Sequence, residues 1–230
     1  MQENRIITFA NQKGGVGKTT LCTLFANYLS AKGERVHVLD CDGQMTIFNK
    51  RGEDMDKYAG SKIPYEVQPV DITIPMSVKS IMESMRKREG TVLLDVPGNL
   101  AQQGLVPIFA MSDYIVCPFQ FESTSINSTA TFIAFILRLQ KLIASMHVKM
   151  IFVVNKWMVR YGNQAEKELW NNTEKHLGRF GLVTPRVSQL ANLQRYNTIE
   201  LMAPQVPHLA PTFDCIYQHI YDKTKKDHDP

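Results

Sequence analysis

The sequence lacks the features that mark disulfide-rich and metal-cluster proteins. Its four cysteines lie far apart and include no C-x-x-C pair, a pattern that argues against a disulfide framework and against a zinc or iron–sulfur site within one chain. We interpret them as reduced thiols of a cytoplasmic protein. The four are Cys22, Cys41, Cys117 and Cys215.

Targeting and membrane-spanning segments are also missing from the pattern. The N-terminus passes directly into the run Ile6–Ala10, without the basic and apolar regions or the small-residue cleavage site of a signal peptide. The most apolar window, residues 129–144, is interrupted by Arg138 and Lys141 and falls short of the ~20 apolar residues that a membrane span needs. We therefore expect a cytoplasmic chain with a buried helix in that window.

Charge of one sign is in only slight excess. The 230 residues include 26 Lys and Arg against 22 Asp and Glu, a net charge of +4, which is compatible with a polyanionic partner but does not identify one. A composition of 44% hydrophobic and 21% charged residues is typical of an ordinary globular protein. Because no internal repeat or linker divides the chain, we predict one domain over residues 1–230.

Short apolar or β-branched runs alternate with helix-length intervals along the chain. Buried strands without polar alternation, separated by helices, are typical of a parallel sheet covered on both faces. We therefore predict an α/β fold, with a doubly wound, mostly parallel sheet and ligands at the carboxyl ends of the strands. The predicted strands are Arg5–Ala10, Arg35–Asp40, Tyr65–Val70, Thr91–Asp95, Asp113–Pro118 and Val148–Val154.

Helical spacing of apolar residues marks four longer segments. Residues 18–32 carry such a stripe and stop at Gly33, a suitable glycine to end a helix. Residues 123–145 should form the longest helix and residues 164–180 a polar surface helix. A C-terminal helix is expected at about 212–226.

The most informative segment, Asn11–Thr20, lies between the first strand and the first helix. Its three glycines allow successive N–H groups to converge on an anion at the positive end of the helix. Lys18 can then reach the β- and γ-phosphates of a nucleotide, and the Thr19 hydroxyl can coordinate Mg²⁺. The usual phosphate-loop pattern requires a glycine where this chain has Gln12.

The second lysine makes the loop resemble the deviant Walker A motif of the ParA/MinD superfamily of P-loop ATPases. The string Lys13–Thr19 matches that superfamily's pattern, K-G-G-x-x-K-[ST], in full. The resemblance implies a homodimer that sandwiches ATP, in which Lys13 reaches the phosphates bound by the partner subunit. A second cation there would stabilise charge on the transferred phosphoryl group.

Two further acidic motifs occur in the expected order. Residues 40–44, Asp-Cys-Asp-Gly-Gln, resemble the superfamily's switch I motif, which implies that Asp42 positions the attacking water and that Asp40 lies close to the magnesium ion. An aspartate at a strand end can equally cap a helix or form a turn. The apolar strand that ends at Asp95 has the Walker B form, and its carboxylate can hold Mg²⁺.

The segment after the last strong strand bears on the choice of nucleotide. Met158 stands where a GTPase has the aspartate that grips guanine, so the pattern favours ATP. The resemblance implies that the Asn155 amide contacts adenine, although an asparagine at a strand end is also a common turn residue. The expected ATP-binding residues are Gly14, Gly15, Val16, Gly17, Lys18, Thr19, Thr20 and Asn155.

The resemblance covers residues 5 to about 204 and is greatest to the ParA-type, TraA-like proteins of Bacteroidetes conjugative elements. It implies a slow, partner-stimulated Mg²⁺-dependent ATPase that positions or partitions DNA by non-specific, nucleotide-dependent binding, with an adapter or stimulating protein. Nucleoid association would follow. A lysine-rich tail is more often merely solvated. Candidate DNA contacts are Arg186, Arg195, Lys223, Lys225 and Lys226.

Two other functions use the same kind of scaffold. A MinD-like protein binds a membrane or a protein partner through an amphipathic C-terminal helix, and Phe213, Ile216 and Ile220 form an apolar stripe here. Because the basic residues follow that stripe instead of flanking it, we expect the helix to pack on its own domain and do not expect a membrane partner. A biosynthetic enzyme or kinase is the third alternative, and product analysis would identify it.

Overall fold

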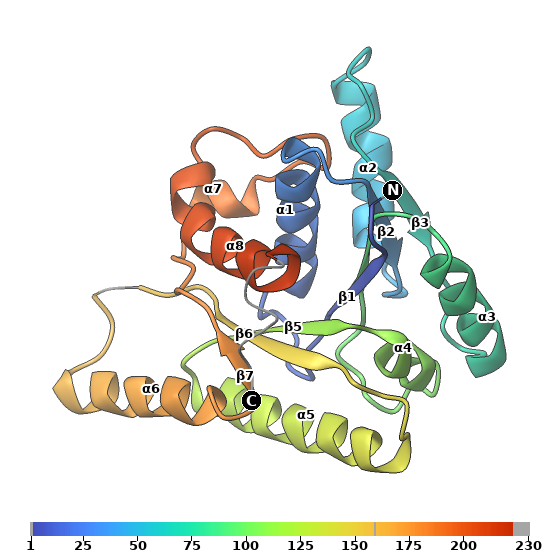
Figure 1. The fold of residues 1–230 in the computed structure, drawn as a ribbon. Helices are drawn as coiled ribbons and strands as arrows, with labels where there is room; N and C mark the ends of the chain where they lie inside the picture. Colours follow the sequence, from blue (N-terminus) through green and yellow to red (C-terminus); the bar gives the residue numbers. More distant parts are fainter. Residues whose placement is uncertain (1, 159, 223–230) are drawn as a thin grey trace.

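A computed structural model describes residues 2–158 and 160–222 and shows a β-sheet with helices on both faces (Figure 1). Within these residues the sheet has the strand order β3-β2-β4-β1-β5-β6-β7, and every neighbouring pair is parallel. The strands are β1 (Arg5–Phe9), β2 (Val36–Asp40), β3 (Glu66–Pro69), β4 (Thr91–Asp95), β5 (Tyr114–Phe119), β6 (Lys149–Val154) and β7 (Gly181–Val183). The predicted doubly wound α/β fold is confirmed.

The helices cover the sheet in two layers, because successive strand residues point to opposite faces. Ile7 and Phe9 of β1 pack with α1, α2, α7 and α8, whereas Ile6 packs with α3, α4, α5 and α6. Figure 1 shows α1, α7 and α8 above the sheet and α5 and α6 below it. The helices are α1 (Lys18–Ala31), α2 (Thr46–Lys57), α3 (Pro75–Arg86), α4 (Leu105–Met111), α5 (Ser123–Leu142), α6 (Gln164–Leu177), α7 (Ala191–Gln194) and α8 (Val206–Tyr221).

The observed elements follow the predicted pattern closely, with differences at the C-terminal end. All six predicted strands are present, and β7 is an additional three-residue edge strand too short to carry a periodic signal. Helix α8 begins at Val206, where Pro207 is well placed in a first helical turn. Part of the C-terminal helix expected at 212–226 lies outside the described residues.

The C-terminal helix α8 packs on the domain's own core. Its apolar stripe contributes Phe213, Ile216 and Ile220, each 1% exposed, to the cluster that includes β1 and α1. In residues 2–158 and 160–222, no helix has the length and apolar character needed to cross a membrane. All four cysteines are free thiols, and Cys22, Cys41 and Cys117 are buried.

Strand register determines where the functional site forms. Asp40, the last residue of β2, pairs with Asp95, the last residue of β4, and Asp95 also pairs with Phe9 at the end of β1. Three strands therefore end side by side, and the loop that follows β1 lies directly beside two carboxylates.

Candidate nucleotide-binding site

The loop between β1 and α1 forms one wall of an open cavity of about 450 Å³ at the carboxyl edge of the sheet. Gly15 and Gly17 adopt left-handed conformations, with φ of 77° and 97°, which glycine adopts without steric cost. Helix α1 starts at Lys18 with no side-chain cap, so its first N–H groups remain available for an anion. The cavity is lined by Gly14, Gly15, Gly17, Lys18, Thr19, Thr20, Asp42, Gly98, Lys156 and Gln194.

Lys18 is held inside this cavity. Its side chain is 9% exposed, and its Nζ donates a hydrogen bond to the backbone oxygen of Lys13 at 3.3 Å. Burial lowers the pKa of Lys18, and the nearby carboxylates of Asp95 and Asp42 oppose that shift. A buried cation with one long hydrogen bond is well suited to an anionic ligand, because a phosphate would supply the missing charge.

Asp95 and Thr19 form the part of the cavity that fits a divalent cation. The Thr19 hydroxyl donates to Asp95 Oδ2 at 2.6 Å. Burial raises the pKa of Asp95 to about 7, the Thr19 hydrogen bond lowers it, and the neighbouring Asp40 carboxylate raises it further. Among the described residues, the second oxygen of Asp95, Oδ1, is buried without a hydrogen-bond partner.

Asp40 combines two of the roles that the sequence left open. Its Oδ2 accepts hydrogen bonds from the backbone N–H groups of Ile47 at 2.8 Å and Phe48 at 3.0 Å, which anchors the first turn of α2. Burial raises its pKa, and these backbone hydrogen bonds lower it. Its Oδ1 is buried with no partner in the described part of the chain. Asp40 therefore links the carboxylate pair to α2.

The buried, unpartnered oxygens of Asp40 and Asp95 suit Mg²⁺, which prefers oxygen ligands. No cluster of three or more His, Cys, Asp or Glu in the described residues could hold a metal by itself. Mg²⁺ sites commonly combine one or two carboxylates with phosphate oxygens and water. The donor set therefore fits a magnesium ion that is bound together with a nucleotide, with the Thr19 hydroxyl as a third protein ligand.

Asp42 lies at the rim of the cavity, where it is half-buried. Its Oδ1 accepts the backbone N–H of Gln44 at 3.0 Å and its backbone oxygen accepts the N–H of Met45, so the carboxylate sits on a tight turn. Met45 has a positive φ of 48° and immediately precedes α2. This arrangement leaves Asp42 close to Lys18 while its second oxygen faces no printed partner atom within the described chain.

Asn155 braces the phosphate loop from the end of β6. Its Nδ2 donates to the backbone oxygen of Val16 at 2.8 Å, and the side chain is 7% exposed. A Cβ on Gly17 would lie 2.2 Å from this amide nitrogen. A recess of about 40 Å³, lined by Asn155 and Gly17 among others, adjoins the cavity. The structure thus places Asn155 beside the loop, where the predicted adenine contact would require sharing this amide.

Lys156 is a cavity residue that the sequence reasoning missed. Its Nζ donates to the backbone oxygen of Gly15 at 2.7 Å, and its φ of 55° turns the chain after β6 toward the loop. Gln120 also reaches Gly15 O, at 3.3 Å. A lysine directly after a strand-ending asparagine was the only available signal for Lys156. None pointed to Gln120, because its contact depends on the pairing of β5 with β1.

Lys13 lies at the start of the loop and is not among the residues that line the cavity. It is half-buried, and its backbone N–H donates to Asn11 Oδ1 at 3.2 Å. Asn11 is held in turn by hydrogen bonds from its Nδ2 to Pro118 O and Thr129 Oγ1. The base of the loop is therefore rigidly attached to β5 and α5.

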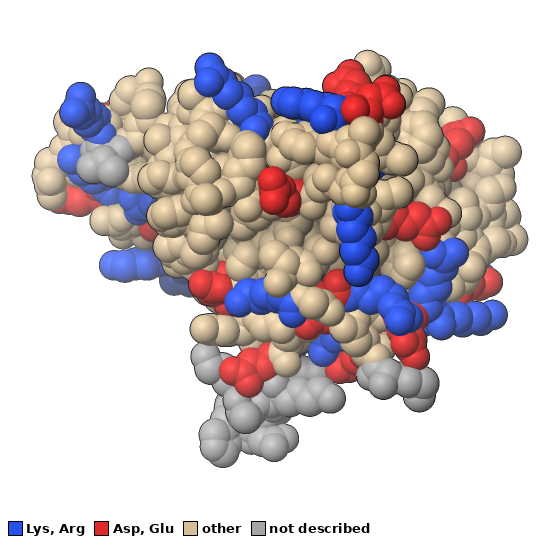
Figure 2. Space-filling model, turned by 90° about the horizontal axis from the view of Figure 1, so that it is seen from above, with Lys and Arg blue, Asp and Glu red and all other residues tan. Residues whose placement is uncertain are grey.

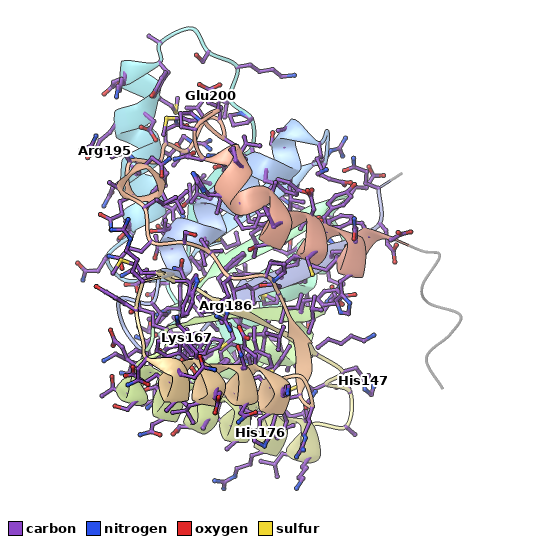
Figure 3. All side chains as sticks on the ribbon, turned by 90° about the vertical axis from the view of Figure 1, so that its left-hand side faces the viewer. His147, Lys167, His176, Arg186, Arg195 and Glu200 are labelled. Atoms are coloured by element: carbon purple, nitrogen blue, oxygen red, sulfur yellow. The ribbon has the colours of Figure 1, made fainter. Side chains whose placement is uncertain are left out.

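The predicted DNA contacts are not brought together by the structure. Arg186 makes a two-pronged ion pair with Glu174, bonds to Asn171, and lies over the Trp157 ring at 4.4 Å. Arg195 follows α7 and is exposed. Figure 3 shows Arg186 beside α6 and Arg195 well above it. Lys223, Lys225 and Lys226 lie outside the described residues.

Surface charge and cavity chemistry support the loop cavity as the site. Figure 2 shows basic and acidic residues interspersed on the face seen from above, without a large area of one sign. A cavity of about 400 Å³ between α5 and α6 is lined almost entirely by apolar residues, among which His176 is the one titratable side chain. Phosphate needs converging N–H groups and cations, which the loop cavity has and the α5–α6 cavity lacks.

These features define a nucleotide-binding P-loop protein: the phosphate loop, its lysine and its buried Walker B aspartate all occupy the carboxyl edge of one parallel sheet. Residues 7–198 match the model of the CobQ/CobB/MinD/ParA nucleotide binding domain, and the chain belongs to this family. The predicted membership of the ParA/MinD superfamily is thereby confirmed.

Known relatives and solved structures agree with this assignment. The chain is 28% identical to the chromosome-partitioning ATPase Soj of Thermus thermophilus, over 88% of this chain and 90% of that protein. A plasmid partition protein from Borrelia burgdorferi has a similar fold, with a TM-score of 0.68 and 17% identity over 95% of this chain and all of that one. A complex of Cyanothece McdA with ATP has a TM-score of 0.73 and 12% identity, over 95% and 96% of the two chains.

Proposed function

We propose that the protein is a Mg²⁺-dependent ATPase switch that forms an ATP-sandwich dimer and positions or partitions DNA by nucleotide-dependent, non-specific binding. The observation that carries this proposal is the arrangement of the two signature lysines. Lys18 lies inside the chain's own cavity, whereas Lys13 stands at the loop's edge and does not line it. A partner subunit's nucleotide would give Lys13 a phosphate to contact.

The chain's own residues divide the work of such a cycle. Loop N–H groups and Lys18 would bind the phosphates, while Thr19, Asp95 and Asp40 would hold a magnesium ion, which when bound neutralises phosphate charge. Asp42 would orient the attacking water. Lys13 from the partner would stabilise charge on the transferred group, so hydrolysis would require the dimer.

Local contacts give this cycle a way to change the protein's shape. Asp40 is bonded to the first turn of α2, and Asp42 occupies the turn just before that helix. Binding or loss of the γ-phosphate would therefore act on both ends of the turn that joins β2 to α2. Ordering and release of such segments is a common switch in nucleotide-binding proteins.

The DNA part of the proposal rests on the family and on the relatives that carry partition names. Membership of the TraA-like group of conjugative elements, an adapter protein that stimulates hydrolysis, and nucleoid association are further parts of this proposal. The membrane alternative is less well supported, because α8 buries its apolar stripe in the domain core.

The decisive experiment measures retention of Asp42→Ala protein on random-sequence duplex DNA and on anionic liposomes, with ATP or ADP, at low and moderate salt. We expect salt-sensitive retention on DNA with ATP and none with ADP, because Asp42→Ala should trap the ATP dimer. Asp56→Ala, which removes an exposed aspartate of α2, is the matched control and should hydrolyse ATP like the unmodified protein.

Three results would contradict the proposal in different ways. An Asp42→Ala protein that still turns over ATP would remove the water-positioning role. Absence of DNA retention in both nucleotide states would remove the partition function, and capture by liposomes would then support a membrane cycle. A phosphorylated acceptor, instead of free phosphate and ADP alone, would identify a kinase.

A further inference from the structure

A second polar pocket lies between α2, α7 and the start of α8. Its volume is about 340 Å³, and it shares no lining residue with the phosphate-loop cavity. Lys50 and Lys57 line it from α2, and Arg195 lines it from the residue after α7. Figure 3 shows Arg195 between α2 and α7, close to the loop that carries Glu200. The volume is within the range of small-molecule sites, roughly 300–1,000 Å³.

The pocket carries an excess of positive charge. Among the described residues that line it, Asp54 is the one with a carboxylate. Asp54 lies 3.6 Å from Lys50, and its Oδ2 accepts hydrogen bonds from both the N–H and the hydroxyl of Thr198. Lys57 and Arg195 form no ion pair within residues 2–158 and 160–222. Two cations are therefore left without a counter-charge at the opening of one pocket.

Two asparagines on the pocket wall have buried polar atoms without partners in the described chain. Asn197 is 3% exposed, and its Oδ1 accepts the N–H groups of Ile199 and Glu200, but its Nδ2 donates to nothing. Asn192 donates from Nδ2 to Pro204 O, while its Oδ1 has no donor. Buried polar groups without partners are rare in folded proteins, because each loses its hydrogen bond to water. They point to a ligand with its own donor and acceptor.

Aromatic rings complete the wall. Lys50 Nζ lies 5.5 Å from the centre of the Tyr196 ring, and Lys57 Nζ lies 5.4 Å from that of Tyr58. Both tyrosines line the pocket. A ring with an adjacent cation offers a face for a planar group beside a site for an anion.

We infer that this pocket binds a small phosphate ester with a planar polar group, in the size class of a mononucleotide, independently of the nucleotide at the phosphate loop. Arg195 and Lys57 would contact the phosphate, because guanidinium and ammonium groups are the usual partners of phosphate oxygens. Tyr58 and Tyr196 would pack on the planar group. The amide groups of Asn192 and Asn197 would supply one acceptor and one donor to its edge.

Such a ligand would join α2 to the segment that leads into α8. Existing contacts already connect them: Arg51 on α2 donates to Thr198, and Asp54 accepts from it. Because α2 starts at the Asp40 carboxylate, the pocket and the magnesium side of the loop cavity share one helix. The inference does not depend on DNA partition, since it needs only the described side chains.

Calorimetry on the full chain tests this inference. The protein is loaded with one equivalent of ADP and Mg²⁺, freed of excess nucleotide, and titrated with AMP, GMP, UMP and inorganic phosphate, while bound ADP is measured in parallel. We expect at least one mononucleotide to bind with ADP retained, and inorganic phosphate to bind more weakly. Arg195→Ala and Lys57→Ala should each weaken binding about tenfold or more, through loss of a charge-assisted hydrogen bond.

Arg179→Ala is the matched control, because Arg179 is an exposed arginine just beyond α6, and it should change nothing. Absence of binding by every probe at millimolar concentration would overturn the inference. Binding that is equal in the unmodified, Arg195→Ala and Lys57→Ala proteins would also overturn it, as would release of one ADP for each probe bound. If both variants lose DNA retention and no mononucleotide binds, the cations serve DNA and the inference is wrong.

Discussion

Single side chains in the loop cavity are held ready for a ligand by contacts that each leave something unsatisfied. Lys18 has one long hydrogen bond to a backbone oxygen, and Asp95 has one bonded and one unpartnered carboxylate oxygen among the described atoms. Both groups are buried, so both charges would be expensive without a ligand. A nucleotide with Mg²⁺ would satisfy them together, which explains why they stay buried side by side.

Replacing Lys18 by alanine should weaken ATP binding by about a hundredfold or more, because it removes a charge-assisted contact to the phosphates. Titration with a fluorescent ATP analogue measures this, and thermal unfolding checks that the variant is folded. Lys149→Ala removes an exposed lysine at the start of β6 and should bind like the unmodified protein. Near-normal affinity in Lys18→Ala would refute the assigned phosphate contact.

Replacing Lys13 by alanine should leave ATP binding nearly unchanged while abolishing the ATP-dependent dimer and hydrolysis. The reason is that Lys13 does not line its own cavity and is proposed to act on the partner's phosphates. Light scattering after gel filtration reports the dimer, and phosphate release reports hydrolysis. Hydrolysis at the unmodified rate by Lys13→Ala would show that the partner-directed role is mistaken.

Gly17→Ala should destabilise the nucleotide-free protein by roughly 2 kcal/mol, the order expected for a strained left-handed residue with a steric clash. Gly17 has a φ of 97°, and a Cβ there would meet Asn155 Nδ2 at 2.2 Å. Gly14→Ala is the matched control, because a Cβ at Gly14 has nothing within 4 Å. Urea unfolding compares them, and equal stabilities would contradict this account of the loop.

At the scale of elements, α2 is joined to the body of the protein at both of its ends. Its first turn bonds to Asp40, and further along Arg51 is 6% exposed and donates to Tyr65 O and to Thr198 at O and Oγ1. Hydrogen bonds from a buried guanidinium to several segments fix the position of a helix that otherwise buries few side chains. Ile47, Arg51 and Asp54 are its buried residues.

Arg51→Met should lower the free energy of unfolding by about 3 kcal/mol, because it strands buried carbonyl groups and the nearby Asp54 carboxylate. Lys57→Met changes an exposed lysine on the same helix and should alter stability by less than about 0.5 kcal/mol. Chemical denaturation monitored by circular dichroism compares the two. If Arg51→Met is as stable as Lys57→Met, the network does not hold α2 in place.

At the scale of the whole molecule, the proposed function requires two subunits to act before DNA is bound. Adding Lys13→Ala to Asp42→Ala should therefore abolish the ATP-dependent DNA retention of the single Asp42→Ala variant. Retention of the single variant should also fall steeply between 50 and 200 mM salt, by about a thousandfold or more if six or more phosphates are contacted. Filter binding measures both, and full retention by the double variant would separate DNA binding from dimer formation.

Much of the site was predictable because its signals are local. A loop with Gly14, Gly15 and Gly17 between a strand and a helix fixes where phosphates can bind, and a strand that ends in Asp95 places a carboxylate at the same edge. The roles of Asp42 and Lys13 came from a family resemblance to the same short motifs. Gly181–Val183 escaped detection because a three-residue strand has too little periodicity to recognise.

By itself, the sequence determined the parallel α/β fold, the phosphate loop and the carboxylates beside it, since periodicity and spacing within a few residues encode all three. Only the tertiary structure decided that Asn155 braces the loop and that Lys156 enters the cavity, through contacts between residues 139 and 141 positions apart. It also decided that Arg186 is paired with Glu174 and that Arg195 lines a separate pocket. Side-chain partners across such distances depend on how whole elements pack, which no local pattern records.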